Sequence, residues 1–110
     1  VLLNLNLKQN MFGANGVAAA VMGMGKTPLK TLDLTRTEMG GATDSMIESL
    51  SSAICHQLGL LMDLRMDDNE LSCKESAIAP LCKLRSLRTL SLEKNRLTAI
   101  PPLLGTMLSL

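Results

Sequence analysis

A short stretch in the first quarter of the chain has the residue types of a phosphate-binding loop. Residues 20–27 have the sequence AVMGMGKT, which matches the loosest form of that motif. In such a loop backbone N–H groups hold the phosphates, the lysine contacts their oxygens and the threonine hydroxyl binds Mg²⁺. The motif is short and degenerate, so the elements on either side of it decide whether it binds a nucleotide.

The elements around this stretch stand in the wrong order for a nucleotide site. A phosphate-binding loop follows a buried strand, and its Gly-Lys-Thr begins a helix. Here the apolar residues at positions 17, 20, 21 and 24 predict a helix before the motif, and Leu29, Leu32 and Leu34 predict a strand after it. Pro28 also favours an extended backbone at Thr27. We therefore expect a helix-to-strand turn and no bound cofactor.

Three further groups of reactive side chains favour ordinary structural roles. Cys55 and His56 are neighbours in the sequence, but adjacent positions on a helix do not face each other. Cys73 and Cys82 do not have the spacing of zinc ligands. The acidic residues between 63 and 70 lack the spacing and the central glycine of a calcium-binding loop. The sequence predicts no catalytic residue and no metal ligand, and therefore a protein that is not an enzyme.

The composition bounds the size of the protein and the classes of partner. A chain of 110 residues forms one domain with a modest core, and its 46% hydrophobic residues include one aromatic, Phe12. Eleven basic residues stand against ten acidic ones, so no basic excess points to nucleic acid. The apolar run 17–25 is too short to cross a membrane. Three cysteines, an odd number, favour a reducing compartment, and we expect an intracellular, cytoplasmic protein.

A repeated pattern of leucines organises the chain. The template L-x-x-L-x-L-x-x-N-x-L, with other apolar residues allowed at its last two leucine positions, fits four segments. Its asparagine position falls at residues 10, 37, 69 and 95, and these positions are 27, 32 and 26 residues apart. Thr37 replaces asparagine in the second unit, and Met11 and Phe12 fill the last apolar position of the first. Repeats of this length indicate stacked units, so further repeats are expected at both ends.

Each unit of the template predicts the same local structure. The L-x-L part is a short strand with its apolar residues facing inward, and strands are expected near 3–8, 30–35, 62–67 and 88–93. The asparagine then bends the chain, and its amide bonds backbone groups that would otherwise be buried unpaired. Stacked units place these asparagines in a ladder, with a looser turn expected at Thr37.

The segments between the predicted strands change along the chain. Apolar residues with helical spacing predict a helix in each of the first two units. In the third unit a Ser72–Glu75 capping box predicts the start of a helix that Pro80 limits or bends. In the fourth unit Pro101 and Pro102 stand where a helix was, and Leu110 is expected to open a fifth unit.

The repeats resemble the leucine-rich repeat family over nearly the whole chain, residues 1–110, which we take as a single domain of about four repeats. The resemblance implies an α/β fold. In it, a segment of a curved, horseshoe-shaped solenoid has a parallel sheet on its concave side, and helices followed by an extended or 3₁₀ segment on its convex side. The first units are similar to the ribonuclease-inhibitor-like subtype of NOD-like receptors and Ran GTPase-activating proteins, and the last to shorter leucine-rich repeats. Because the chain begins at Val1, we expect a fragment of a longer protein.

The resemblance implies a protein-interaction scaffold that binds its partner mainly on the concave strand face. Alternate side chains of each strand point outward and line up across the units. We expect a protein partner, alone or within a larger complex, and neither nucleic acid nor a membrane. The alternative is a GTPase-regulating domain like Ran GTPase-activating proteins, by family analogy alone. The expected partner-binding residues are Asn6, Lys8, Asp33, Thr35, Asp63, Arg65, Asp67, Ser91 and Glu93, with Arg36, Asp68 and Lys94 extending the rim.

Overall fold

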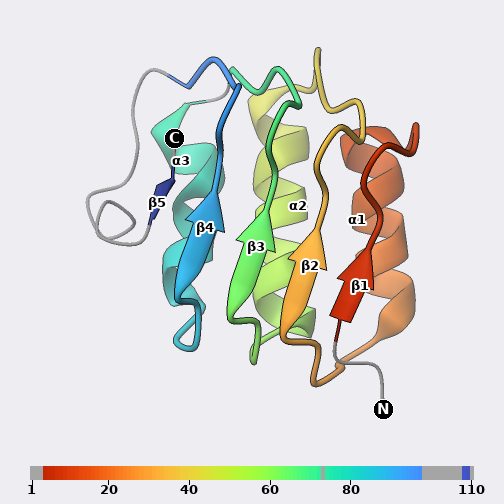
Figure 1. Cartoon of the computed structure of the whole chain (residues 1–110), viewed down its shortest axis with the longest axis vertical. Helices are drawn as coiled ribbons and strands as arrows, with labels where there is room; N and C mark the ends of the chain where they lie inside the picture. The colour runs from red at the N-terminus through yellow and green to blue at the C-terminus, as the bar shows by residue number, and fades with distance from the viewer. Residues whose placement is uncertain (1–3, 73, 98–107, 110) are drawn as a thin grey trace.

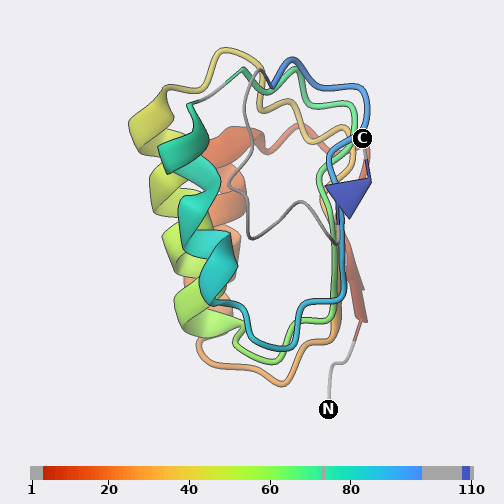
Figure 2. The same ribbon diagram turned by 90° about the vertical axis from the view of Figure 1, so that its left-hand side faces the viewer.

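The computed structural model describes residues 4–72, 74–97 and 108–109, which form one sheet with helices on one side of it. The strands are β1 (Asn4–Asn6), β2 (Thr31–Asp33), β3 (Asp63–Arg65), β4 (Thr89–Ser91) and β5 (Leu108–Ser109). All are parallel and lie in the order of the sequence. The helices form a second layer that packs against a single face of the sheet (Figure 1 and Figure 2). The predicted α/β class with a parallel sheet is therefore confirmed.

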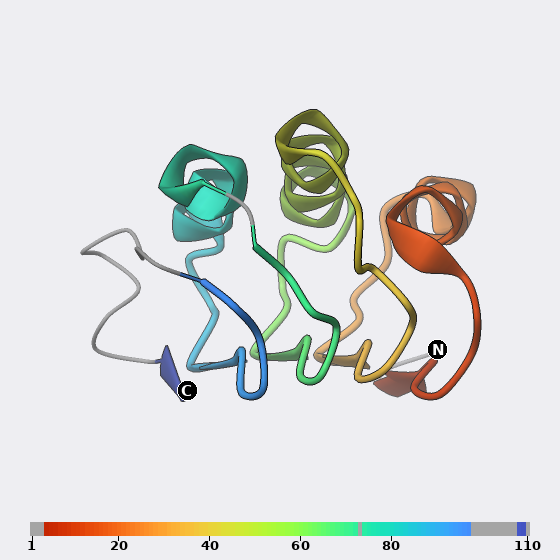
Figure 3. The ribbon, with the colours of Figure 1, turned by 90° about the horizontal axis from the view of Figure 1, so that it is seen from above.

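Helical segments follow each of the first three strands. They are α1 (Gly13–Met24), α2 (Asp44–Gln57), and α3 (Glu75–Ile78), which continues into the 3₁₀ helix η1 (Ala79–Lys83). Viewed from above, they stand in one row beside the sheet (Figure 3). Pro80 lies at the start of η1, where its missing N–H is tolerated, and the α-helix before it ends at Ile78. The predicted limit on this helix is thus confirmed.

The starts of α2 and α3 are stabilised in different ways. Thr43 caps α2, because its hydroxyl accepts the N–H of Met46 at 3.2 Å. The predicted capping box at Ser72–Glu75 is wrong, because α3 begins after Lys74 and that residue makes no side-chain cap. Instead Asp44 Oδ1, at the first residue of α2, accepts the N–H of Lys74 at 3.1 Å. A carboxylate from the neighbouring helix thus binds the backbone where α3 begins.

The strand register places the repeated leucines next to one another. Leu5, Leu32, Leu64 and Leu90 are paired in successive strands, so the structure keeps the spacing of the sequence template. The predicted start of a fifth unit at Leu110 is wrong, because Leu108 already pairs with Leu90 at the second leucine position of the template. The fourth unit therefore has fewer residues between its strands than the first three, and its segment expected to be extended or 3₁₀, around Pro101 and Pro102, lies outside the described residues.

The core lies between the sheet and the helices and is built from aliphatic side chains and methionine. The inward leucines Leu32 and Leu64 are at most 1% exposed, and Ile47 and Ile54 of α2 are fully buried in the same cluster. Met66 is fully buried as well, as its place in the template predicts. Burial of this kind supplies most of the free energy of folding, because it removes apolar surface from water.

The last apolar position of the template is buried in the middle units and exposed in the first. Met39 and Leu71 are each 1% exposed, whereas Met11 and Phe12 are 82% and 42% exposed. The first unit therefore departs from the later ones at this position of the template. In the described sheet β1 has a neighbouring strand on one side only. Within the described sheet, this exposure coincides with the position of β1 at the edge.

The asparagines of the template form the predicted ladder of hydrogen bonds. Asn69 donates its amide to the carbonyls of Leu34 and Met66 at 2.9 and 3.1 Å, and its Oδ1 accepts the N–H of Thr37 at 2.8 Å. Asn95 donates to the carbonyl of Met66 at 2.9 Å and accepts the N–H of Asn69 at 3.0 Å. Each of these asparagines therefore satisfies backbone groups of its own unit and of the preceding unit.

Thr37 occupies the asparagine position of the second unit and closes a tight turn, so the expected loosening is absent. The residue is fully buried, and its hydroxyl donates to the carbonyl of Leu34 at 3.0 Å. The single hydroxyl of Thr37 does not reach the first unit as well. In that unit the carbonyl of Leu7 accepts the side-chain amide of Asn10, from its own unit, at 3.0 Å. The step between the first two units therefore lacks the side-chain amide that links the later units.

Candidate functional site

The Gly-Lys-Thr stretch forms the predicted turn between a helix and a strand. Helix α1 ends at Met24, and the N–H of Gly25 donates to the carbonyl of Met22 at 3.3 Å. The Thr27 N–H donates to the carbonyl of Gln57 at 3.2 Å, and the Thr27 hydroxyl is buried, away from any solvent-borne ion. The helix therefore presents its carbonyl end, which carries partial negative charge, to this stretch. That polarity is the opposite of what phosphate binding requires.

Two glycines of this stretch give a direct test of its structural role. Gly25 has φ 64° and ψ −163°, a conformation almost restricted to glycine, whereas Gly23 is helical. A Cβ at either position would meet nothing within 4 Å. We expect Gly25→Ala to lower the free energy of unfolding by about 1–3 kcal/mol through backbone strain alone. Gly23→Ala is expected to raise it by about 0.5–1 kcal/mol. Urea denaturation measures both, and equal effects at the two positions would contradict the structural role.

Three of the four acidic residues between 63 and 70 have separate partners. Asp67 accepts the hydroxyl of Ser91, and Asp68 forms an ion pair with Arg36. Asp63 faces Arg65 of its own strand. In the part of the chain that the structure describes, no group of three or more histidine, cysteine, aspartate or glutamate side chains is placed to hold a metal ion.

The outward side chains of the strands form rows on the side of the sheet away from the helices, which we call the open sheet face. The register aligns Asn6 with Asp33, Arg65 and Ser91 across β1 to β4. Asp63 lies in the row before, next to Thr31 of β2. Just beyond the strands, the same spacing places four residues in the next row: Lys8, Thr35, Asp67 and Glu93. The residues expected to bind a partner thus lie on adjoining rows of one face.

Two side chains of the open sheet face hold the backbone that follows their own strand. Asn6 Oδ1 accepts the N–H of Lys8 at 2.9 Å, and Asp33 Oδ1 accepts the N–H of Thr35 at 3.0 Å. These bonds stabilise the turns that follow β1 and β2. They also fix the direction of the carbonyl and carboxylate groups, which are therefore in place before any partner arrives.

Asp67 links the third and fourth units on the same face. Its Oδ1 accepts the hydroxyl of Ser91 at 2.6 Å and the N–H of Glu93 at 2.7 Å. Ser91 is 4% exposed, so it contributes to the face by orienting Asp67. The negative charge at the centre of the face is therefore built into the fold.

Arg65 is the exposed cation at the middle of the open sheet face. It borders a shallow hollow of about 360 Å³ over the first three strands, together with Asn6, Asp33 and Asp63. The Arg65 side chain is 51% exposed, and its Nε lies 3.6 Å from Asp63 Oδ1, too far for a hydrogen bond. That oxygen is buried and has no hydrogen-bond partner among the described residues. A pair with this long a separation and an exposed arginine contributes little to stability, so the Arg65 guanidinium remains available to a partner.

A second hollow, which the sequence did not indicate, lies in the turns that lead from the strands to the helices. It has a volume of about 780 Å³, and we call it the rim pocket. Its charged residues are Arg36, Asp68, Glu38 and Glu70. The two glutamates occupy the same template position, directly after residues 37 and 69. The sequence therefore shows that the two glutamates are equivalent in their units. It does not predict a pocket, because this position of the template is variable.

Comparison with known proteins supports the repeat interpretation for the fourth unit. The Leucine Rich Repeat family model matches residues 86–107, which include β4. Neither a curated protein nor a solved structure matches the chain. Within the described residues, no helix combines the length and the apolar character that crossing a membrane demands.

Proposed function

We propose that the chain is a non-enzymatic protein-interaction module that binds its partner on the open sheet face. The observation that carries this proposal is the in-register alignment of polar side chains across four parallel strands. Leucine-rich repeats generally use such stacked strands as extended binding surfaces, and the family match at residues 86–107 supports repeats of this kind. In the proposed architecture the units form a segment of a solenoid, a single domain whose concave side is the open sheet face.

The chemistry of this face favours a partner that is polar and carries both signs of charge. Arg65 and Lys8 are exposed cations, and Asp33 and Asp67 are carboxylates already held by hydrogen bonds. Because the carboxylates are preorganised, binding costs less side-chain entropy than it would on a mobile surface. Electrostatic complementarity of this kind sets specificity and the association rate more than the affinity.

The subtype and the location of the protein belong to the same proposal. The lengths of α1 and α2, 12 and 14 residues, support units of the ribonuclease-inhibitor-like subtype in the first part of the chain. The free thiols of Cys55 and Cys82 support the expectation of an intracellular protein. Regulation of a GTPase stays a prediction from family analogy.

The test uses charge reversals that leave the structural bonds of the face intact. Lys8→Glu with Arg65→Glu removes two exposed cations, whereas reversal of Asp33 or Asp67 would also break bonds to the backbone. We expect the double variant to lose about tenfold or more in affinity for proteins captured by the wild-type chain, since each tenfold loss corresponds to about 1.4 kcal/mol. Quantitative affinity capture, followed by titration of the partner, measures this loss.

A matched control separates the face from the net charge of the chain. Lys83→Glu with Arg85→Glu makes the same change of charge at exposed positions in and after η1, away from the sheet. This control is expected to keep wild-type affinity. If both double variants lose affinity equally, or if neither does, the assignment of the open sheet face is wrong.

A further inference from the structure

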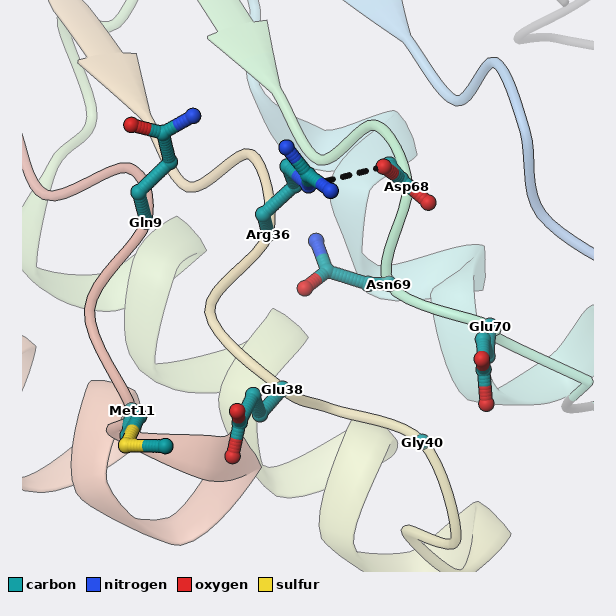
Figure 4. Close-up of a pocket in the computed structure, with 8 residues that line it drawn as sticks. All are labelled: Gln9, Met11, Arg36, Glu38, Gly40, Asp68, Asn69 and Glu70. Atoms are coloured by element: carbon teal, nitrogen blue, oxygen red, sulfur yellow. Dashed lines mark ion pairs between the residues drawn. The ribbon is translucent and has the colours of Figure 1, made fainter.

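The rim pocket lies in the turns that leave β1, β2 and β3, beside the open sheet face (Figure 4). One wall is formed by Gln9, Arg36 and Asp68, and the other by Met11, Glu38 and Glu70. Each wall is a row, because its three residues stand directly before or directly after residues 10, 37 and 69 of the template. Its volume of about 780 Å³ lies within the usual range of pockets that hold a small ligand or a side chain.

The two walls differ in charge. Arg36 Nε lies 3.0 Å from Asp68 Oδ2, so these residues neutralise each other in the first wall. Among the described residues, Glu38 and Glu70 make neither an ion pair nor a side-chain hydrogen bond. The rim pocket therefore carries two uncompensated carboxylates next to a wall that is neutral overall.

Gly40 provides the space that the Glu70 carboxylate occupies. A Cβ at this position would lie 3.0 Å from Glu70 Oε2 and 3.3 Å from Glu70 Cβ. Gly40 does not have a positive φ, so the site uses its missing side chain and not its backbone freedom. An added Cβ therefore requires Glu70 to move by a few tenths of an ångström, and a β-branched side chain requires a larger movement.

At the end of the pocket formed by the first unit, Gln9 is polar and Met11 is apolar. Met11 lines it and is 82% exposed, and the adjacent Phe12 is 42% exposed. Phe12 is the single aromatic residue of the chain, and large aromatic side chains are frequent anchors of protein interfaces. The thioether of Met11 adapts to the shape of what it contacts. Two carboxylates beside an apolar edge thus complement a segment that has a cation next to an apolar residue.

We propose that the rim pocket binds an arginine-bearing segment of a partner protein. The guanidinium lies against Glu38 and Glu70, and the apolar neighbours of the arginine pack on Met11. A guanidinium suits this site because its N–H groups form a planar fork that matches carboxylates, and its aliphatic stem packs on apolar surface. The neutral wall of Arg36 and Asp68 admits this cation without net repulsion. The site differs from the open sheet face, so variants can remove one without the other.

The test uses a defined probe, a short capped peptide of alternating leucine and arginine, with a control peptide in which citrulline replaces arginine. Citrulline keeps the shape and removes the charge. Titration into the isotopically labelled chain, followed by amide NMR, is expected to shift the amides of Gln9, Glu38, Gly40 and Glu70. Affinity is expected to fall about tenfold or more with citrulline or in the Glu38→Gln, Glu70→Gln double variant, and to weaken with added salt.

Further variants keep the test independent of folding and of the open sheet face. Gly40→Val retains both glutamates but displaces Glu70, so it is expected to weaken the arginine peptide as well. Thermal unfolding checks that each variant remains folded. Glu48→Gln on α2 and the Lys8→Glu, Arg65→Glu double variant are expected to bind like the wild type. Absence of binding, equal binding of the citrulline peptide, unchanged affinity of the Gln double variant, or shifts confined to the open sheet face would each overturn the proposal.

Discussion

Replacement of Asn69 by alanine is expected to lower the free energy of unfolding by about 2–4 kcal/mol. The residue is 2% exposed, and its side chain bonds four backbone groups in two units. In the variant, the carbonyl of Leu34 still accepts the hydroxyl of Thr37, and the carbonyl of Met66 still accepts the side-chain amide of Asn95. The N–H of Thr37 has no other partner among the hydrogen bonds of the described residues, so it would be left buried and unsatisfied.

The equivalent residue of the first unit supplies the control for this measurement. Asn10 makes the same type of bond to the carbonyls of Leu7 and Lys8, but it is exposed, so water replaces its amide when the side chain is removed. We expect Asn10→Ala to cost less than about 1 kcal/mol. Chemical denaturation of both variants gives the comparison. A cost at Asn69 no larger than at Asn10 would show that the ladder does not hold the units together.

Leu64→Ala is expected to cost about 3–5 kcal/mol and to unfold the chain at a much lower temperature. Leu64 is fully buried in β3, between the paired leucines Leu32 and Leu90 of the adjacent strands. Truncation removes apolar contacts and leaves a cavity that the close-packed neighbours fill only in part.

Leu60→Ala is the control, because it makes the same substitution at an exposed leucine. It lies shortly before β3 and is 55% exposed, so Leu60→Ala is expected to change the free energy of unfolding by no more than about 0.5 kcal/mol. Calorimetry of the two variants separates the loss of a buried contact from the loss of a leucine. Similar melting temperatures for the two would contradict the core that the structure describes.

The repeated features of the fold could be predicted because they depend on spacing alone. The L-x-L pattern fixes which side chains of β1 to β4 face the core, and the asparagine ladder follows from the need to satisfy buried backbone groups. The end of α1 before Lys26 was predictable for the same reason, since helical and alternating patterns meet at that point.

Features that depend on contacts between units escaped prediction. The start of α3 is held by Asp44, which lies 30 residues before Lys74. Met11 is 82% exposed although its template position is buried in the second and third units, and no local pattern distinguishes these cases.

The candidate sites also have some features that the sequence predicts and others that depend on contacts between units. The rows of the open sheet face follow from strand alternation, but the bonds that occupy Asp67 and Ser91 come from a neighbouring strand. The rim pocket depends on the distance between Gly40 and Glu70, which belong to different units. A template describes one unit at a time, so a site formed between units becomes visible only in the structure.

Because Thr37 replaces asparagine, the junctions between successive units differ in their side-chain hydrogen bonds. The step from the first unit to the second has the backbone bonds Leu7 to Asp33 and Gln9 to Thr35, but lacks an asparagine amide across it. The steps on either side of β3 have both kinds of bond. In a chain of nearest-neighbour contacts, fraying starts at the weakest junction and proceeds one module at a time. Among the described turns, we therefore expect the junction between the first two units to open most easily when a partner docks.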